Sequence, residues 1–184
     1  MVIGVKTGSI LGFDGALQDL FQGVKSSAWL SFFEAVSTLG TTTVIGGGSL
    51  LFLIWLWFFK RNYWAMAIFA IGVGGGNLLN KFVKNSVARE RPIGSLEAES
   101  LSYSFPSGHA MVGMVFYGLL AYFITKELKS KSIKWGIGIV VSLIMLIMGV
   151  SRIILNSHFT SDVIAGYALG AAWTLVCMYI SKHK

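Results

Sequence analysis

The chain has 184 residues, of which 54% are hydrophobic and only 12% are charged, and its mean hydropathy is +0.69. A soluble domain carries roughly a quarter of its residues as charged groups, so this composition excludes an ordinary soluble protein and predicts a membrane protein. The net charge of +7 would suit nucleic acid. However, the basic residues flank apolar runs and form no polar, aromatic-interleaved surface, and we therefore expect no nucleic-acid partner.

Residues 1–40 are predicted to form short helices that lie in the membrane interface. Apolar side chains recur on one helical stripe between residues 13 and 24, whereas Asp14 and Asp19 fall off that stripe, which is typical of an amphipathic interfacial helix. A second short helix, rich in aromatic residues, is predicted to end near Gly40. The stripe consists of Phe13, Leu17, Leu20, Phe21 and Val24, and the second helix carries Trp29, Phe32, Phe33 and Val36.

Five later stretches lack charged residues and have nearly the length of about 20 residues that a helix needs to cross a bilayer. The sequence therefore predicts an all-α, polytopic transmembrane bundle at residues 41–184, within a single membrane-embedded domain that covers residues 1–184. A sixth, earlier span is an alternative. Gly166 and Gly170 form a GxxxG pair that close helix packing explains. The expected spans are Thr43–Phe59, Asn62–Asn80, Ala110–Thr125, Trp135–Val150 and Val163–Ile180.

Three groups of basic residues set the expected orientation. If the spans alternate in direction, all three groups lie on one side of the membrane, and their positive charge marks that side as cytoplasmic. The C-terminus is then cytoplasmic, and the segments that follow Asn80 and Ser151 face the outside. The groups are Lys60 and Arg61; Lys126, Lys129, Lys131 and Lys134; and Lys182 and Lys184.

The first polar segment at the outer ends contains Lys84 and Arg91. Ionisable groups are costly at such positions unless they work together. Their spacing of seven residues, about two turns, predicts one shared helix face before Pro92 ends the helix. Two cations on one face suit an anionic headgroup, although they could equally snorkel to lipid phosphates. Lys81 and Arg89 are interpreted as headgroup-facing or structural.

The second polar segment, residues 106–109, opens the third span. Ser107 is a favoured N-cap, and N–H groups at a helix start bind phosphate. Gly108 lets the backbone approach an anion closely, and His109 could donate a proton to a leaving oxygen. Taken alone, this segment is explained better by a simple helix cap.

The third polar segment contains His158 and Asp162, four residues apart and thus expected on one helical face, with Arg152 just upstream. A carboxylate beside an imidazole fixes the tautomer and raises the nucleophilicity, but an isolated pair could also simply cap or bridge the helix. Together, the three segments provide the groups that phosphoryl transfer requires. Because the sequence has no HExxH motif, cysteine cluster or paired-carboxylate magnesium site, we expect no metal and no cofactor.

These segments resemble the three signatures of the type 2 phosphatidic acid phosphatase superfamily, K-x6-R-P, P-S-G-H and S-R-x5-H-x3-D. That superfamily also includes vanadium haloperoxidases and bacterial acid phosphatases. The resemblance covers roughly residues 13 to 181. The matching runs are Lys84-NSVARE-Arg91-Pro92, Pro106-Ser107-Gly108-His109 and Ser151-Arg152-IILNS-His158-FTS-Asp162, in the same order.

The resemblance implies a role for each matching residue. His158 would be the nucleophile that forms a phosphohistidine, and Asp162 would orient and activate it. His109 would protonate the leaving group and then activate water. The phosphoryl oxygens would be held by Lys84, Arg91, Ser107, Gly108 and Arg152.

The resemblance thus implies a bacterial enzyme of the cell membrane, with an outward-facing site, that removes phosphate from a lipid phosphate or pyrophosphate. The implied substrates are undecaprenyl pyrophosphate, phosphatidylglycerol phosphate or phosphatidic acid. Two alternatives stay open: a lipid phosphotransferase, and a non-hydrolytic lipid-phosphate binder, transporter or sensor. The second would need the cations but not His158 beside Asp162. A soluble substrate or haloperoxidase chemistry is disfavoured, because the site lies at the mouth of a small membrane bundle.

Overall fold

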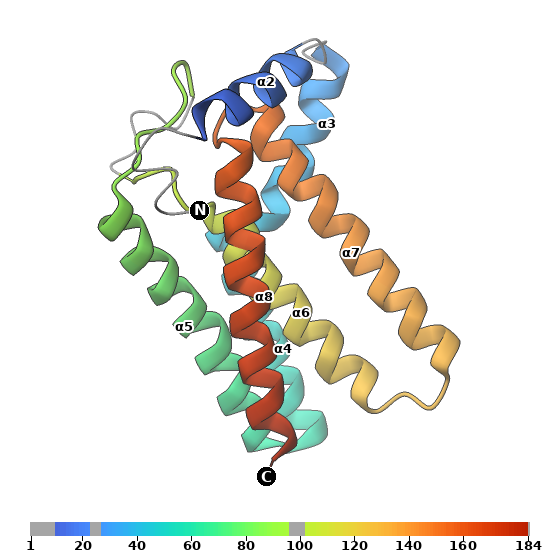
Figure 1. Cartoon of the computed structure of the whole chain (residues 1–184). Coiled ribbons are helices and arrows are strands. Elements are labelled where there is room, and N and C mark those ends of the chain that lie inside the picture. Colours follow the sequence, from blue (N-terminus) through green and yellow to red (C-terminus); the bar gives the residue numbers. More distant parts are fainter. Residues whose placement is uncertain (1–9, 23–26, 96–101, 184) are drawn as a thin grey trace.

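The computed structural model describes residues 10–22, 27–95 and 102–183, and the regular elements of these residues are helices (Figure 1). Two short helices precede five long ones, and each predicted span overlaps one of the five helices that are long and apolar enough to cross a membrane. The predicted all-α polytopic bundle is therefore confirmed. The elements are α2 (Leu11–Gln22), α3 (Ser27–Ser37), the 3-10 turn η1 (Thr38–Gly40), α4 (Thr42–Trp55) with its π-helical continuation η2 (Leu56–Lys60), α5 (Tyr63–Val87), α6 (Gly108–Lys126), α7 (Lys131–Ile154) and α8 (Thr160–Lys182).

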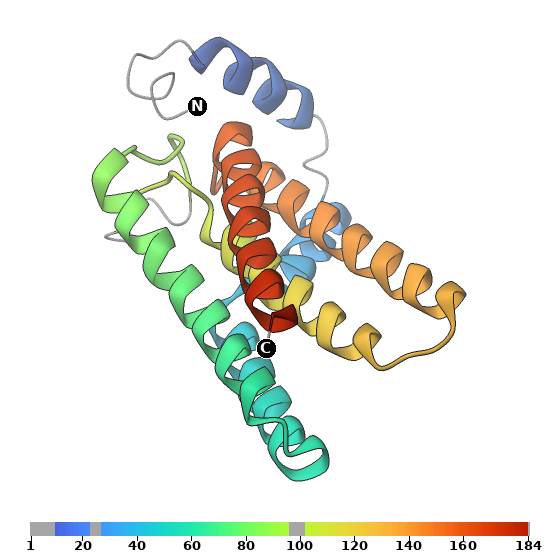
Figure 2. The same ribbon diagram turned by 60° about the horizontal axis from the view of Figure 1, so that its bottom comes forward.

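Helix α6 forms the centre of the bundle and contacts α4, α5, α7 and α8 (Figures 1 and 2). Its aromatic side chains continue a core that begins in α4 and α5: the ring centroids of Phe52 and Phe69 lie 4.7 Å apart, and those of Phe69 and Phe116 lie 6.0 Å apart. Such rings contribute both buried area and edge-to-face contacts. This core holds α4 and α5 against α6.

Helices α6 and α8 make the most intimate contact, and glycine makes it possible. A β-carbon on Gly170 would lie 2.6 Å from the carbonyl oxygen of Met111, and one on Gly166 would lie 2.8 Å from the carbonyl oxygen of Ser107. Any side chain at either position would collide with the backbone of α6. The predicted packing role of this glycine pair is confirmed, and the close contact sets the start of α8 beside the start of α6.

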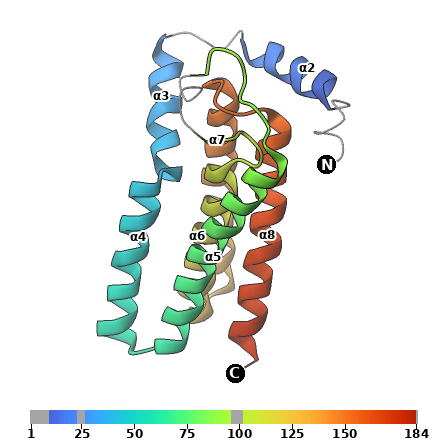
Figure 3. The same ribbon diagram turned by 90° about the vertical axis from the view of Figure 1, so that its left-hand side faces the viewer.

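The two short helices are present, as predicted. Helix α2 lies across one end of the bundle (Figure 1), and α3 stands on α4 with a break at η1 (Figure 3). In α2, the apolar side chains of Phe13 and Leu20 are 50% and 69% exposed, whereas Asp14 is only 1% exposed. Phe13 and Leu20 therefore point outward, as an interfacial helix requires, whereas Phe21 of the same stripe packs against the cluster of Ala110, Ile153 and Val163. Asp14 points into the protein and not into water.

The molecule has two ends of different composition, one covered by α2 and one formed by the basic connections. The N-terminal ends of α4, α6 and α8 and the C-terminal ends of α5 and α7 face the end that α2 covers, which we call the site end (Figure 1). The described basic connections and the C-terminal end of α8 lie at the opposite, basic end, where Lys60 forms an ion pair with Glu127. The predicted separation of the basic connections from the three polar segments is confirmed.

Candidate functional site

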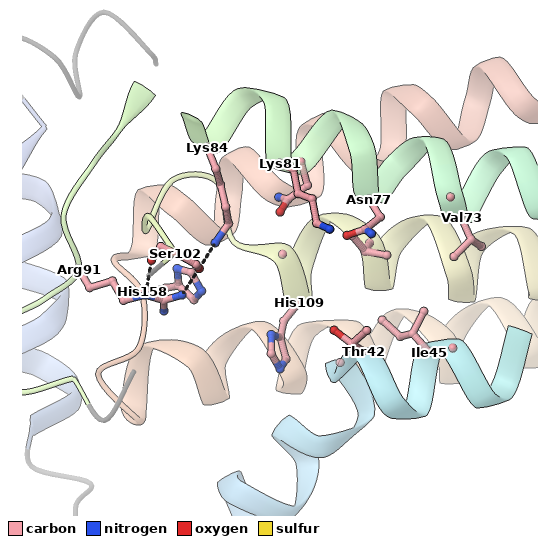
Figure 4. Close-up of a pocket in the computed structure, with 16 residues that line it drawn as sticks. Thr42, Ile45, Val73, Asn77, Lys81, Lys84, Arg91, Ser102, His109 and His158 are labelled. Carbon is pink, nitrogen blue, oxygen red and sulfur yellow. Dashed lines mark hydrogen bonds between the residues drawn. The ribbon is translucent and has the colours of Figure 1, made fainter. Parts of the chain in front are cut away.

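The three polar segments meet at one cavity of about 400 Å³ near the site end (Figure 4). Lys84, Arg91, His109 and His158 line its polar part. The wall continues between α4 and α5 with apolar and glycine residues: Ile45, Gly46, Val73 and Gly74. Cations, two imidazoles and an apolar wall thus share one cavity, although they come from distant parts of the chain.

Lys84 and Arg91 reach the cavity by a route that differs from the prediction. Helix α5 ends at Val87 because Ala88 adopts a left-handed conformation, with φ of 52°, and its N–H donates to the carbonyl oxygen of Lys84 at 2.9 Å. Arg91 therefore lies outside the helix, and the predicted shared helix face is wrong. The chain turns back after Ala88, and this turn brings both cations to the same cavity.

Residues 102 and 103 hold these two cations in place. The ammonium group of Lys84 donates to the carbonyl oxygen of Tyr103 at 2.6 Å and to the hydroxyl of Ser102 at 3.3 Å. Arg91 donates to the carbonyl oxygen and the hydroxyl of Ser102, both at 3.0 Å, and to the carbonyl oxygen of Ser157 at 2.9 Å. These bonds order the positive charge beside the histidines before any ligand binds.

The start of α6 forms as predicted, with Ser107 as N-cap. The hydroxyl of Ser107 accepts from the N–H of Ala110 at 3.5 Å, and its own N–H donates to the carbonyl oxygen of Asp162 at 3.0 Å. Gly108 and His109 line the cavity, and Ser107 is buried behind them. The first turn of α6, with its N–H groups and the positive end of the helix dipole, therefore reaches the cavity wall.

His158 lies in the short connection between α7 and α8. Because α8 begins at Thr160, His158 precedes the helix, and the predicted common helical face with Asp162 is wrong. The two side chains still approach: 3.6 Å separates Nδ1 of His158 from Oδ2 of Asp162, slightly beyond hydrogen-bond length. Nδ1 is thus the nitrogen beside the carboxylate, which leaves Nε2 as the nitrogen available for the cavity.

Burial controls the charge of His158, whose side chain is only 2% exposed. Burial lowers the pKa of His158 to about 4, and the positive charges of Arg152 and Arg91 act in the same direction, against the opposing effect of Asp162. The imidazole is therefore neutral at pH 7. A neutral imidazole has the lone pair that a nucleophile needs.

Asp162 is fully buried and is held from several sides. Its Oδ2 accepts from the hydroxyl of Ser104 and from the N–H of Phe159, the latter at 2.9 Å, and its Oδ1 accepts from Arg89 at 2.7 Å. Arg89 also forms an ion pair with Asp14 at 2.7 Å. This position fits the interpretation of Arg89 as structural. The sequence does not predict the two carboxylates that pair with it, because no local pattern connects Asp14 with Arg89.

Arg152 and Ser107 do not line the cavity among the described residues. The guanidinium of Arg152 is buried and donates to the hydroxyl of Ser37 at 2.6 Å. The carbonyl oxygen of Arg152 accepts the N–H groups of Ser157 and His158, at 3.0 and 3.2 Å. Arg152 thus supports the connection that carries His158, and a direct contact of Arg152 or Ser107 with phosphate stays a prediction.

Three further polar residues of α5 line the cavity, although the sequence analysis did not include them in the site: Asn77, Asn80 and Lys81. Asn77 and Lys81 lie along the same helix as Lys84, toward the apolar wall (Figure 4). Among the described residues, no three histidine, cysteine, aspartate or glutamate side chains gather where they could hold a metal ion. The positive charge of the described cavity wall comes from lysine and arginine side chains.

Fold and site together define a polytopic α-helical membrane protein with a cavity lined by lysine, arginine and histidine at one end of its bundle. The family profile of the PAP2 superfamily matches residues 63–184, which carry all three polar segments, and the chain belongs to this superfamily. This confirms the family resemblance that the motifs indicated.

Known proteins similar to the chain agree with this assignment. Phosphatidylglycerophosphatase B of Bacillus subtilis (strain 168) is 37% identical over 115 residues, which are 61% of this chain and 56% of that protein. The chain thus spans a little over half the length of this curated relative.

Two crystal structures share the fold. The first transmembrane PAP2-type phosphatidylglycerolphosphate phosphatase from Bacillus subtilis superposes with a TM-score of 0.89 at 24% identity, over 100% of this chain and 94% of that chain. LpxE of Aquifex aeolicus superposes with a TM-score of 0.67 at 20% identity, over 89% of this chain and 93% of that chain.

Proposed function

We propose that this protein is a metal-independent lipid phosphatase that works through a phosphohistidine intermediate. The observation that carries the proposal is that His158, neutral and beside Asp162, lines the same cavity as His109, Lys84 and Arg91. Family membership and the name of the curated relative support the same activity. A site built only to bind phosphate would need the cations but not a carboxylate behind a buried imidazole.

In the first half-reaction, Nε2 of His158 attacks the phosphorus, and a P–N bond forms as the P–O bond to the lipid breaks. His109 gives its proton to the departing lipid oxygen, while Lys84 and Arg91 balance the charge on the phosphoryl oxygens. Asp162 stabilises the positive charge that develops on the imidazole of His158. The products of this step are the free lipid and the phosphorylated enzyme.

In the second half-reaction, His109 takes a proton from water, whose oxygen attacks phosphorus. The P–N bond breaks, inorganic phosphate leaves, and His158 returns to its neutral form. Gly108 brings the first turn of α6 to the cavity wall, where its dipole favours a bound phosphate. The hydroxyl of Ser107 accepts from Ala110 and could still donate its own hydrogen to a phosphate, and Arg152 binds Ser37 through one of its nitrogens, so we retain both as candidates.

The lipid tail has an apolar path into this site. The wall between α4 and α5 lets an acyl or prenyl chain lie beside the headgroup cavity. The basic connections at the other end favour a cytoplasmic location for that end and for the C-terminus, so the site would face outward. Phosphatidylglycerol phosphate is the first candidate because of the curated relative, and undecaprenyl pyrophosphate and phosphatidic acid are the others.

A lipid phosphotransferase is the second candidate function. It would share the first half-reaction, because the same phosphohistidine could pass its phosphoryl group to a lipid alcohol in place of water. Incubation of the enzyme with substrate and an excess of lipid alcohol separates the two. Release of inorganic phosphate supports hydrolysis, and formation of a new phospholipid at the expense of inorganic phosphate supports transfer.

The test is a substrate panel with purified protein in detergent and excess EDTA. We expect phosphate release from at least one of the three lipid substrates, with little from a soluble phosphate ester. The His158→Ala variant should bind lipid phosphate but release none. Glu90→Gln, at an exposed position near the site end, is the control and should behave as wild type. Turnover by His158→Ala, or a strict need for a divalent ion, would contradict the mechanism.

A further inference from the structure

Helix α2 contacts the bundle through polar side chains, and its Phe21 also packs against the apolar cluster of Ala110, Ile153 and Val163. Asp14 and Gln18, one helical turn apart, both point toward the protein, and the amide nitrogen of Gln18 donates to the side-chain oxygen of Asn156. The apolar side chains of Phe13 and Leu20 remain exposed on α2. The polar contacts of α2 therefore lie on the side that faces the connection between α7 and α8, where His158 is located.

Asp14 caps the start of α8 from a distance of 147 residues in the sequence. Its Oδ1 accepts from the N–H of Ser161 at 2.9 Å, and its Oδ2 accepts from the hydroxyl of Ser161 at 2.6 Å. The residue at the N-cap position of α8, Phe159, has no polar side-chain atom that could accept these donors. A carboxylate at a helix N-terminus is also favoured by the helix dipole. Asp14 therefore fixes the helix turn that carries Asp162.

Arg89 connects this cap to Asp162. Its guanidinium donates to Oδ2 of Asp14, to Oδ1 of Asp162 and to the hydroxyl of Ser161, each at 2.7 Å. The same group lies 4.0 Å from the ring centroid of Phe159, in cation–π contact. One buried cation is thus shared by two buried carboxylates, and only one of these carboxylates adjoins His158.

We infer that Asp14 is a positioning residue for the phosphoryl-transfer site and acts on Asp162 through Arg89 and Ser161. The inference rests on the proposed function. With Asp14 present, Arg89 forms ion pairs with both carboxylates and neutralises Asp162 only in part. The negative charge of Asp162 can then stabilise the imidazole of His158. Without the charge of Asp14, the ion pair between Arg89 and Asp162 strengthens and draws Asp162 away from Nδ1 of His158, which already lies 3.6 Å from Oδ2.

A purely structural role for Asp14 makes a different prediction. Replacing one partner of a buried ion pair destabilises a protein because the other charge is left without compensation. If Asp14 only held α2 in place, a variant would unfold more easily, but each folded molecule would turn over at the wild-type rate. If Asp14 positions Asp162, the folded variant turns over more slowly and binds its substrate normally, since Lys84 and Arg91 are untouched.

The experiment compares steady-state kinetics of Asp14→Asn with wild type and with Glu90→Gln, a matched loss of one carboxylate at an exposed position. Asn keeps the size and one of the two acceptor oxygens that Ser161 uses but loses the charge and the second acceptor. We expect kcat per folded molecule to fall roughly 10- to 100-fold, the range known for residues that orient a working side chain in metal sites. We expect KM to stay within about twofold, because the loss of an interaction made only in the transition state lowers kcat and kcat/KM equally. Glu90→Gln should match wild type.

A double-mutant cycle tests whether Asp14 acts on Asp162 through Arg89. In the Arg89→Ala background, Asp14→Asn should lower kcat by no more than about twofold, because the connection is already broken. If Asp14→Asn does not fold, Ser161→Ala removes the hydroxyl that Asp14 and Arg89 share, and it should also lower kcat and leave KM unchanged. Wild-type kcat in the folded Asp14→Asn variant, or independent effects of the two substitutions, overturns the inference.

The same assays keep this inference distinguishable from the proposed function. A wild-type protein without phosphatase activity, or an active His158→Ala variant, contradicts the proposed function itself. An active wild type, an inactive His158→Ala variant and an unimpaired Asp14→Asn variant contradict only the role of Asp14.

Discussion

The buried, neutral state of His158 should make the protein sensitive to acid. The pKa of His158 is lowered from 6.5 to about 4, mainly by burial. As the pH falls below 6.5, the unfolded chain binds a proton on this imidazole and the native protein does not, so unfolding is favoured progressively until about pH 4. Above pH 6.5 the imidazole is neutral in both states, and its contribution to stability is fully present.

The structure sets the size of this effect. A gap from 6.5 to about 4, at about 1.4 kcal/mol for each pH unit, amounts to about 3 kcal/mol over the whole window. At pH 5, the same relation gives a loss of about 2 kcal/mol relative to pH 7. A change of this size is a large part of the 5–15 kcal/mol stability that is typical of proteins.

The assay is the free energy of unfolding of wild type and His158→Gln in one detergent, measured at pH 7 and pH 5 by tryptophan fluorescence. Wild type should lose about 2 kcal/mol more than His158→Gln, because the variant lacks the titrating group in both states. His183→Gln, at an exposed position at the basic end, is the control for removing an imidazole elsewhere. Equal losses in wild type and His158→Gln would refute the reasoning that burial keeps this histidine neutral.

Three further outcomes are expected. Asp162→Asn should lower kcat by up to about 10⁴-fold, the loss known when a carboxylate that orients a catalytic histidine becomes an amide; a loss below tenfold in the phosphate-release assay would argue against its role. Gly170→Ala should destabilise the protein by about 1–3 kcal/mol in thermal or denaturant unfolding, because its β-carbon would meet the backbone of α6. Gly138→Ala, where a β-carbon meets no atom within 4 Å, should show no such loss. Vanadate should inhibit competitively by forming a pentacoordinate adduct with His158, and undiminished turnover at millimolar vanadate would count against histidine as the nucleophile.

The cations near the site differ in their hydrogen-bond and ion-pair partners. Lys84 donates to the carbonyl oxygen of Tyr103, and Arg91 donates to the carbonyl oxygens of Ser102 and Ser157. Arg89, in contrast, is paired with two carboxylates. Lys84 and Arg91 line the cavity, where an anionic ligand could reach them, whereas Arg89 holds two buried carboxylates in place. This difference in partners separates the roles of arginines that lie only two residues apart.

Local sequence features determined much of this protein. Apolar runs without charges defined the five long helices, because an apolar helix of sufficient length is stable across a bilayer wherever the run stands in the chain. The alternation of the spans placed the clustered lysines of the connections at one set of span ends and His109 and His158 at the other. Ser107 marked the start of α6 because an N-cap is a local interaction. Motif spacing identified five residues that line one cavity: Lys84, Arg91, Gly108, His109 and His158.

Tertiary structure alone decided how those residues are held. The left-handed turn at Ala88 removed Arg91 from the helix of Lys84, and the start of α8 at Thr160 placed His158 before the helix of Asp162. Asp14, which is hydrophilic in the sequence, became a buried cap for a helix 147 residues away. Hydropathy and helical periodicity describe one segment at a time, whereas a buried charge chooses its partner by the packing of separate segments, and only the assembled bundle specifies that packing.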